Sequence, residues 1–141
     1  MIWHSGTWID GIWMDGIWEG GEWLDGMFVG GTWKDGIWEK GTWYGGVWES
    51  GIWGGGTWVT GTWLGGAWEN GTWKTGTWRK GLWIDGKWLD GMWITGTWES
   101  GVWRQGTWLD GTWKDGIWHA GEWISGEWEN GHRLDHTQAR R

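Results

Sequence analysis

The sequence predicts an all-β protein that coils into a parallel solenoid, and two observations lead to that prediction. The unit Gly-x-Trp-x-x occurs 26 times between Met1 and Asn130 without insertion or deletion. Only Met1, at the first glycine position, and Phe28, at the sixth tryptophan position, depart from it. A five-residue unit cannot bury a large aromatic side chain alone, so neighbouring units must stack on one another.

The residues around each tryptophan favour an extended backbone and then a corner. We name the residue after the glycine x2 and the two residues after the tryptophan x4 and x5. At x2, 18 of 26 residues are Thr, Ile or Val, and at x5, 22 of 26 are Asp, Gly, Ser, Thr or Asn. β-Branched residues favour strands, and small polar residues before glycine favour turns. Each repeat is therefore expected to be a three-residue strand, x2-Trp-x4, followed by a tight corner.

The same pattern excludes helix and places tryptophan inside. A glycine every five residues would cost about 0.8–1 kcal/mol each in a helix, and a period of five would spread tryptophan around the helix surface. In a strand, x2 and x4 share one face and tryptophan points to the other. We expect the indoles to form the interior, with glycine leaving space for them.

Two arrangements of such strands remain possible at this point. The chain can turn the same way at every corner and form a parallel solenoid, or it can form an antiparallel meander of three-residue strands joined by type I' turns. The meander would leave a long indole face exposed, and it would place Glu19 opposite Glu22. The solenoid is therefore favoured.

Repeated segments predict the number of sides of each coil. The segment GTWKDGIW occurs at 31–38 and at 111–118, and GTWK occurs at 31, 71 and 111. These separations are multiples of 40, which fits four repeats per coil and does not fit three. The expectation is a coil of four repeats and about 6.5 coils in all.

The pattern resembles the pentapeptide-repeat family. The small residues Gly6 and Gly11 precede the large residues Trp8 and Trp13 by two positions, as that family's small residue precedes its central Leu or Phe. The resemblance covers 1–130 and implies a right-handed quadrilateral parallel β-helix. Segments such as GEWLDG also look like the core of MORN repeats, and G-T-W-x-G-G runs look like uncharacterised repeat proteins of marine phages.

The chain divides into a solenoid over 1–130 and a C-terminal cap or tail over 131–141. Leu134 is the only large apolar residue of the tail, so a cap would depend on it. The spacing of His132 and His136 suits two metal ligands on a helix, but no third ligand except Asp135 is evident. We expect no metal site.

Outward residues at x4 give a candidate partner surface. With four repeats per coil, Leu24, Tyr44, Leu64 and Ile84 would stack into one exposed apolar column. The same arithmetic would stack Asp15 on Asp35, and Asp90 on Asp110, at corners where carboxylates could hold calcium, although aspartate is also the expected turn residue. Either end of the solenoid could also pair with another chain.

Composition limits the function further. The chain has 141 residues, 25 Trp, 32 Gly, no Cys, no Pro and a net charge of -7. An acidic rod repels phosphate backbones, so direct nucleic-acid binding is not expected. No apolar run is long enough to span a membrane, and the first residues do not form a signal peptide, so the expected location is the cytoplasm or a virion.

No catalytic pattern rises above the repeat. The histidines at x4, His4 and His119, and the serines at the corners do not form a nucleophile–base arrangement, and no cofactor is expected. The leading expectation is a non-enzymatic structural or interaction rod that acts as spacer, scaffold or virion component. The alternatives are a DNA-mimicking regulator of a topoisomerase, as the pentapeptide-repeat resemblance implies, and a carbohydrate-binding module with exposed tryptophans.

Overall fold

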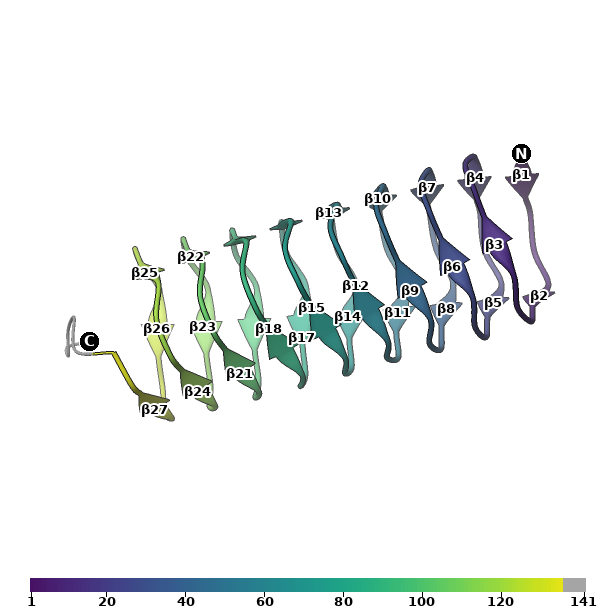
Figure 1. Cartoon of the computed structure of the whole chain (residues 1–141). Helices are drawn as coiled ribbons and strands as arrows, with labels where there is room; N and C mark the ends of the chain where they lie inside the picture. The colour runs from purple at the N-terminus through teal and green to yellow at the C-terminus, as the bar shows by residue number, and fades with distance from the viewer. Residues whose placement is uncertain (136–141) are drawn as a thin grey trace.

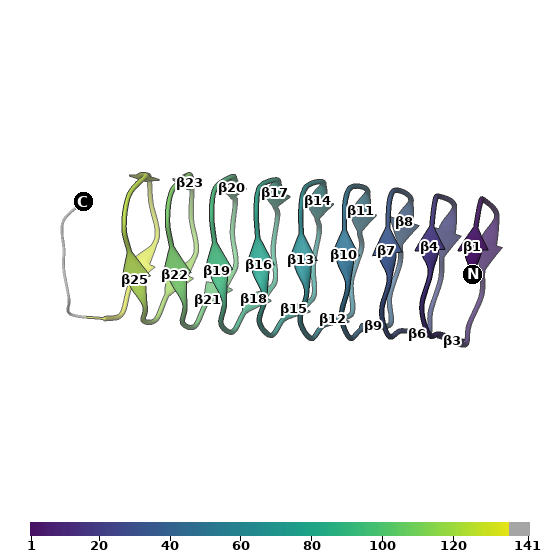
Figure 2. The same cartoon turned by 90° about the horizontal axis from the view of Figure 1, so that it is seen from above.

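The computed structural model describes residues 1–135 as a parallel β-solenoid (Figure 1). The 27 two-residue strands form three nine-stranded sheets, and every strand pairs in parallel with the third strand before or after it along the chain. Figure 2 shows the coils stacked along one axis, with the N-terminus at one end and the last described coil at the other. The prediction of an all-β parallel solenoid is confirmed, and the antiparallel meander is wrong.

Each sheet contains every third strand of the chain, and we name it after its first strand. The β1 sheet contains β1 (Ile2–Trp3), β4 (Ile17–Trp18), β7 (Thr32–Trp33), β10 (Val47–Trp48), β13 (Thr62–Trp63), β16 (Thr77–Trp78), β19 (Met92–Trp93), β22 (Thr107–Trp108) and β25 (Glu122–Trp123). The β2 sheet contains β2 (Thr7–Trp8), β5 (Glu22–Trp23), β8 (Ile37–Trp38), β11 (Ile52–Trp53), β14 (Ala67–Trp68), β17 (Leu82–Trp83), β20 (Thr97–Trp98), β23 (Thr112–Trp113) and β26 (Glu127–Trp128). The β3 sheet contains β3 (Ile12–Trp13), β6 (Met27–Phe28), β9 (Thr42–Trp43), β12 (Thr57–Trp58), β15 (Thr72–Trp73), β18 (Lys87–Trp88), β21 (Val102–Trp103), β24 (Ile117–Trp118) and β27 (His132–Arg133).

Successive coils are joined by the same backbone hydrogen bonds throughout. The x2 N–H donates to the glycine carbonyl of the preceding coil, and the x4 N–H donates to its tryptophan carbonyl. Ala67 N bonds Gly51 O at 3.0 Å and Glu69 N bonds Trp53 O at 2.8 Å, for example. The x4 residue thus takes part in coil pairing although the strand itself spans only x2 and tryptophan, one residue shorter than expected.

The core consists of the aromatic side chains, as the alternation within each strand predicts. Every residue at the tryptophan position from Trp13 to Trp118, Phe28 included, has 0% exposed surface. Within a coil each indole meets the next edge to face, as Trp63 meets Trp68 with ring centroids 5.9 Å apart and planes at 70°. Along the axis the rings stack in three columns, as Trp63 stacks on Trp78 at 4.8 Å and 5°. Both geometries are preferred by aromatic pairs and add about 0.5–1.5 kcal/mol per pair beyond burial.

The number of sides differs from the expectation. Each coil contains three repeats rather than four, so there are nine coils rather than about 6.5. The core gives the physical reason: each indole meets the one before it and the one after it along the chain edge to face, and three such indoles per coil already fill the interior. The three GTWK segments fall on different faces. Their spacing carries no information on coil size, because all repeats occupy equivalent positions.

The repeated glycine is required by the backbone. Gly66 has a φ of +108°, and an added Cβ would lie 2.3 Å from Gly51 O in the preceding coil. Residues with a Cβ atom rarely adopt such a φ, and the neighbouring backbone leaves no room for a methyl group. The indoles are a secondary constraint: the Nε1 atom of Trp63 would lie 3.2 Å from a Cβ at Gly81, whereas Gly66 O would lie only 2.5 Å away.

Candidate interaction surfaces

The solenoid has three outer faces, one for each sheet. We define the β1, β2 and β3 faces as the x2, x4 and x5 residues of the repeats whose strands form the sheet of that name. Because the neighbours on a face come from every third repeat, the sequence assigns a separate composition to each face. The three faces differ mainly in their charge.

The β2 face is acidic. It has ten carboxylates and two lysines. The carboxylates are Asp10, Glu22, Asp25, Glu39, Glu69, Asp85, Glu99, Asp115, Glu127 and Glu129, and the lysines are Lys40 and Lys114. Four of the glutamates, Glu39, Glu69, Glu99 and Glu129, occupy x4 at every second coil, which spaces them about 9.6 Å apart along the axis.

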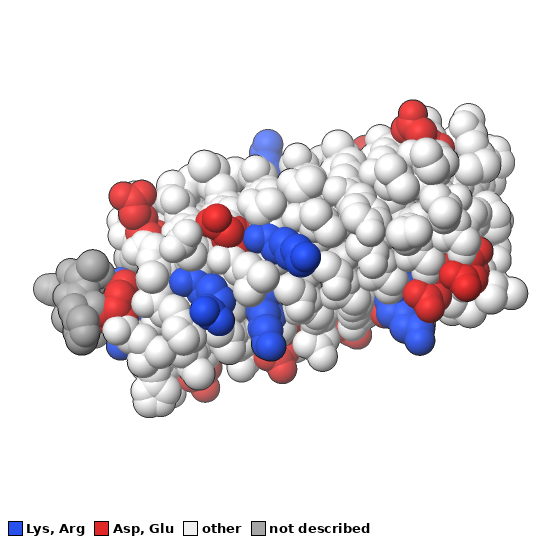
Figure 3. Space-filling model, viewed as in Figure 1, with Lys and Arg blue, Asp and Glu red and all other residues white. Residues whose placement is uncertain are grey.

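The x2 and x4 positions of the β3 face are mainly apolar and uncharged over β3 to β12. These positions carry no Asp or Glu anywhere along the described chain. Ile12 is 54% exposed, Met14 65%, Val29 38% and Tyr44 44%. The β3 to β27 strands face the viewer in Figure 1, and Figure 3 shows the corresponding surface with few charged side chains over its N-terminal half. Basic residues follow in the later coils, and they are Lys74, Lys87 and Arg104.

The first x4 residues of the β1 face include charged side chains of both signs. His4 Nδ1 lies 2.7 Å from Glu19 Oε1, and the next x4 residues along the same face are Lys34 and Glu49. Glu49 therefore lies between Lys34 and Leu64 in the column. A four-sided coil would instead have placed it beside a second glutamate. The exposed position of the His4–Glu19 contact makes it a small contribution to stability.

The expected column of Leu24, Tyr44, Leu64 and Ile84 does not form. Leu24 and Ile84 lie on the β2 face, Tyr44 lies on the β3 face and Leu64 lies on the β1 face. The cause is the three-sided coil, which stacks every third repeat rather than every fourth. Only Tyr44 belongs to a continuous apolar surface, together with its β3-face neighbours at x4.

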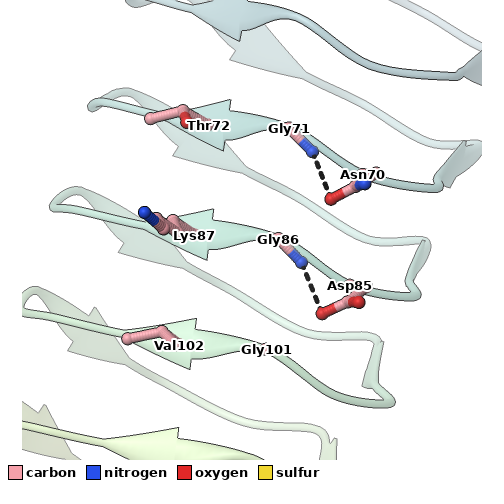
Figure 4. A pocket seen from close by; sticks show the side chains of 8 residues that line it. All are labelled: Asn70, Gly71, Thr72, Asp85, Gly86, Lys87, Gly101 and Val102. Atoms are coloured by element: carbon pink, nitrogen blue, oxygen red, sulfur yellow. Dashed lines mark hydrogen bonds between the residues drawn. The ribbon is translucent and has the colours of Figure 1, made fainter.

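Aspartate at x5 is a turn residue. Asp85 Oδ1 accepts a hydrogen bond from Gly86 N at 2.8 Å, and Asn70 Oδ1 accepts one from Gly71 N at 2.9 Å (Figure 4). Figure 4 also shows Lys87 in the shallow hollow that these corners line. The corner carboxylates thus bind the backbone of the glycine that begins the next repeat.

The aspartate pairs expected to stack at corners are not assembled. Asp15 lies at a corner of the β3 face and Asp35 at a corner of the β1 face. Asp90 and Asp110 are separated in the same way. Among residues 1–135 no group of three His, Asp or Glu side chains could hold a metal ion. His136 lies outside the described residues, so its pairing with His132 has no structural description.

The C-terminal coil contains two capping residues that sequence reasoning missed. Arg133 occupies the tryptophan position of a 27th unit, and its guanidinium carbon lies 5.3 Å from the ring centre of Trp118 and 5.7 Å from that of Trp128. Asp135 Oδ2 accepts the indole N–H of Trp118 at 3.0 Å, and its Oδ1 lies 3.2 Å from Arg133 Nε. These contacts cover the end of the β3-sheet column of indoles, at Trp118.

The signal for this cap was present in the sequence. The glycine Gly131, the large residue Arg133 and the corner residue Asp135 keep the five-residue spacing beyond Asn130. Leu134, on which a C-terminal cap would depend, is 52% exposed at x4, and its N–H donates to a tryptophan carbonyl of the preceding coil at 2.7 Å. The side chains that cover Trp118 are therefore charged rather than apolar.

Corner carbonyls accept some of the buried indole N–H groups. Trp38 donates to Gly55 O at 3.1 Å and Trp83 to Ser100 O at 3.1 Å, in each case to a corner of the next coil. Sixteen buried indole nitrogens in residues 1–135 have no hydrogen-bond partner. Several of them lie beside a glycine of the next coil: the Nε1 atom of Trp43, for example, would lie 3.1 Å from a Cβ at Gly61.

The structure offers few indoles to a ligand. Trp3, Trp8, Trp123 and Trp128 are partly buried and the other tryptophans are fully buried, so the exposed indoles that carbohydrate binding needs are not present on the faces of the described chain. The histidines at x4 are far apart, because His4 lies in the first coil and His119 in the eighth.

The described part of the chain contains no helix of the length and apolarity needed to cross a membrane.

Comparison with known proteins identifies no family. No protein-family model and no curated protein matches the sequence. Among solved structures, a putative acetyltransferase from Desulfovibrio desulfuricans G20 matches with a TM-score of 0.17 and 4% identity, over 84% of this chain and 30% of that chain. The polySia-specific acetyltransferase NeuO matches with a TM-score of 0.19 and 5% identity, over 89% of this chain and 79% of that chain. Similarity this low carries no argument about function, whereas the five-residue periodicity of strands in a parallel solenoid fits a pentapeptide-repeat-like protein.

Proposed function

We propose that this chain is a non-enzymatic rod that serves as a spacer or scaffold. The supporting observation is its uniformity: 27 strands of equal length follow one another without a longer loop, and the aromatic core is continuous from Trp3 to Trp128. Binding and catalytic residues are usually carried by irregular loops on a scaffold, and residues 1–135 have none. Eight spacings of about 4.8 Å make the rod about 38 Å long.

The rod proposal is tested by changing its length. Three further copies of the coil 61–75, inserted after residue 75, should lengthen the particle by about 14 Å without changing its cross-section. Small-angle X-ray scattering measures both quantities. An unchanged maximum dimension would contradict the rod, and so would a turnover activity that one outward substitution abolishes while the circular dichroism spectrum is preserved.

We place this rod in the cytoplasm or in a virion, where it would contact a protein partner through its faces or ends. The virion alternative is supported by the similarity of the G-T-W-x-G-G runs to repeat proteins of marine phages. Neighbouring capsid or tail genes would support that location, and a genomic context without them would count against it. The β3 face over β3 to β12 replaces the dispersed Leu24 column as the surface that suits a protein partner.

A second candidate function is mimicry of duplex DNA, and the charge of the β2 face favours it. Of the five lysines interspersed among the acidic residues, Lys34, Lys74 and Lys80 lie on the other two faces, and Lys40 and Lys114 lie on the β2 face. With ten carboxylates against two lysines, the β2 face is a predominantly acidic surface that a nucleic-acid enzyme could accept in place of DNA.

Topoisomerase inhibition tests this alternative with a matched control. The β2-face variant, in which four glutamates become Gln, should lose inhibition; its positions are Glu39, Glu69, Glu99 and Glu129. The β1-face variant removes the same charge and should keep most of the inhibition; it changes Glu19, Glu49, Asp110 and Glu122 to their amides. No inhibition by the unmodified chain at a large molar excess would reject mimicry, and equal loss in both variants would show a general charge effect instead.

A further inference from the structure

The indole columns bring chromophores into unusually close and regular contact. Away from Phe28, tryptophans of successive coils stack with ring centroids 4.7–5.0 Å apart, as Trp3 does on Trp18 and Trp18 does on Trp33. Each also meets the next aromatic ring of the chain edge to face, as Trp48 meets Trp53 at 5.8 Å and 70°. No tryptophan in residues 1–135 lies outside this network.

We propose that the core conducts electronic excitation along the solenoid and delivers it to the indoles of the first and last coils. Transfer of excitation between like chromophores falls steeply with their separation. Neighbours at ring-contact distance exchange it many times before one of them emits. The tryptophan core would then act as a near-ultraviolet antenna, a role that goes beyond that of a rod and does not depend on it.

The ends collect the excitation because water reaches them. Trp3 and Trp8 at one end, and Trp123 and Trp128 at the other, are only partly buried, whereas every tryptophan between these pairs has no exposed surface. A hollow lined by Trp123, Gly126, Glu127, Trp128 and Glu129 gives solvent access to the later pair. Water dipoles relax around an excited indole and lower its energy, so excitation that arrives there does not return to the dry interior.

Phe28 shows how the network can be probed by substitution. It occupies a tryptophan position, stacks on Trp43 at 4.1 Å and on Trp13 at 5.9 Å, and is itself fully buried. Phenylalanine therefore fits the core without filling the role of an indole acceptor, because its excited state lies at higher energy. The edge-to-face contacts around it leave other routes for transfer, such as the contact of Trp23 with Trp33 at 6.4 Å.

Acrylamide quenching of the full chain tests the proposal. If each indole emitted independently, an external quencher would reach only the emission of the four end indoles among 25. Migration predicts that acrylamide quenches most of the emission, and that the emission maximum is that of a water-exposed indole although the core is dry. A quenched fraction no larger than the share of the end indoles, with emission typical of buried indoles, would overturn the proposal.

A pair of matched variants distinguishes migration of excitation from a higher intrinsic quantum yield of the end indoles. The end variant should shift emission to shorter wavelength and remove most of the quenching; it replaces Trp3, Trp8, Trp123 and Trp128 by Phe. The internal variant should leave the emission maximum and the quenched fraction unchanged; it replaces Trp38, Trp58, Trp78 and Trp98 by Phe. Equal spectra for both variants would contradict delivery to the ends.

Fluorescence polarisation of the unaltered chain gives a test that needs no variant. In a rigid glycerol glass, transfer between the edge-to-face rings should rotate the emitting dipole and bring the anisotropy far below that of free tryptophan in the same glass. Excitation at the red edge of the absorption band should restore the anisotropy, because it selects indoles that cannot pass energy on. An anisotropy equal to that of free tryptophan at every wavelength would refute migration while leaving the rod proposal untouched.

Discussion

Replacing one glycine of the repeat tests whether the backbone demands it. Gly66→Ala places a methyl group on a residue with a φ of +108°, 2.3 Å from Gly51 O. The φ alone costs about 1–3 kcal/mol for a residue with a side chain. To relieve the contact the coil must move away, which weakens the 3.0 Å hydrogen bond from Ala67 N to Gly51 O, worth about 1 kcal/mol. We therefore expect a loss of about 2–4 kcal/mol in the free energy of unfolding.

The adjacent glycine provides the control. Gly65 does not have a positive φ, and an added Cβ would lie 3.5 Å from Glu49 O, an ordinary contact. Gly65→Ala should therefore change the free energy of unfolding by no more than about 0.5 kcal/mol. Gly66→Val should cost more than Gly66→Ala. Urea unfolding followed by circular dichroism measures the three variants, and equal midpoints for Gly65→Ala and Gly66→Ala would refute the reasoning.

Three further substitutions test the core, the corners and the cap. Trp63→Ala leaves a cavity in a fully buried layer and should lower the free energy of unfolding by about 3–5 kcal/mol. Thr62→Ala on the outer surface should lower it far less. Chemical unfolding compares the two variants, and similar losses would contradict the burial of the indole. Asp85→Ala removes the acceptor of the Gly86 N–H and should lower the free energy of unfolding by about 0.5–1.5 kcal/mol. Asp85→Asn should restore most of this stability, because Asn70 makes the same bond to Gly71. An Asn variant as unstable as the Ala variant would contradict the turn role. Asp135→Ala removes the carboxylate that accepts the indole N–H of Trp118 and contacts the guanidinium of Arg133. Hydrogen exchange of the backbone amides should then become faster in the last coil, while the central coils keep their rates. Unchanged exchange at the Leu134 amide would show that the carboxylate does not stabilise the cap.

The strands and the core were predictable because they depend on local alternation. Thr62 and Leu64 had to face outward once Trp63 faced inward, and an indole at every fifth residue is too much apolar surface to leave in water. The requirement for glycine was also visible, but its cause was not. The close approach of Gly66 to Gly51 depends on the coil length, which makes every third repeat a neighbour.

The number of sides was not predictable from repeated segments. Every repeat experiences the same local environment, so a segment such as GTWKDGIW can recur after any whole number of repeats without a change in packing. Coil size depends instead on how many indoles fill one layer. The dispersal of Leu24, Tyr44, Leu64 and Ile84 over three faces follows directly from that difference, as does the acidic β2 face.

The cap at Arg133 and Asp135 escaped prediction because an arginine replaces the tryptophan that defined the repeat. Its fit becomes clear only when the indole surface of Trp118 and the indole N–H group are in view. A cation can lie over the last ring of an aromatic column, and a carboxylate can accept the last indole proton.

Disulfide formation tests the three-sided indole-filled coil most directly, since the chain has no cysteine of its own. Thr62 and Thr77 are paired across neighbouring strands of the β1 sheet, so cysteines at these positions lie within disulfide range. Thr57 and Thr77, which a four-sided coil would pair, lie in different sheets. The account predicts rapid oxidation of the Thr62→Cys/Thr77→Cys variant and none within the Thr57→Cys/Thr77→Cys variant; the reverse result would show a four-sided coil and contradict the structure described.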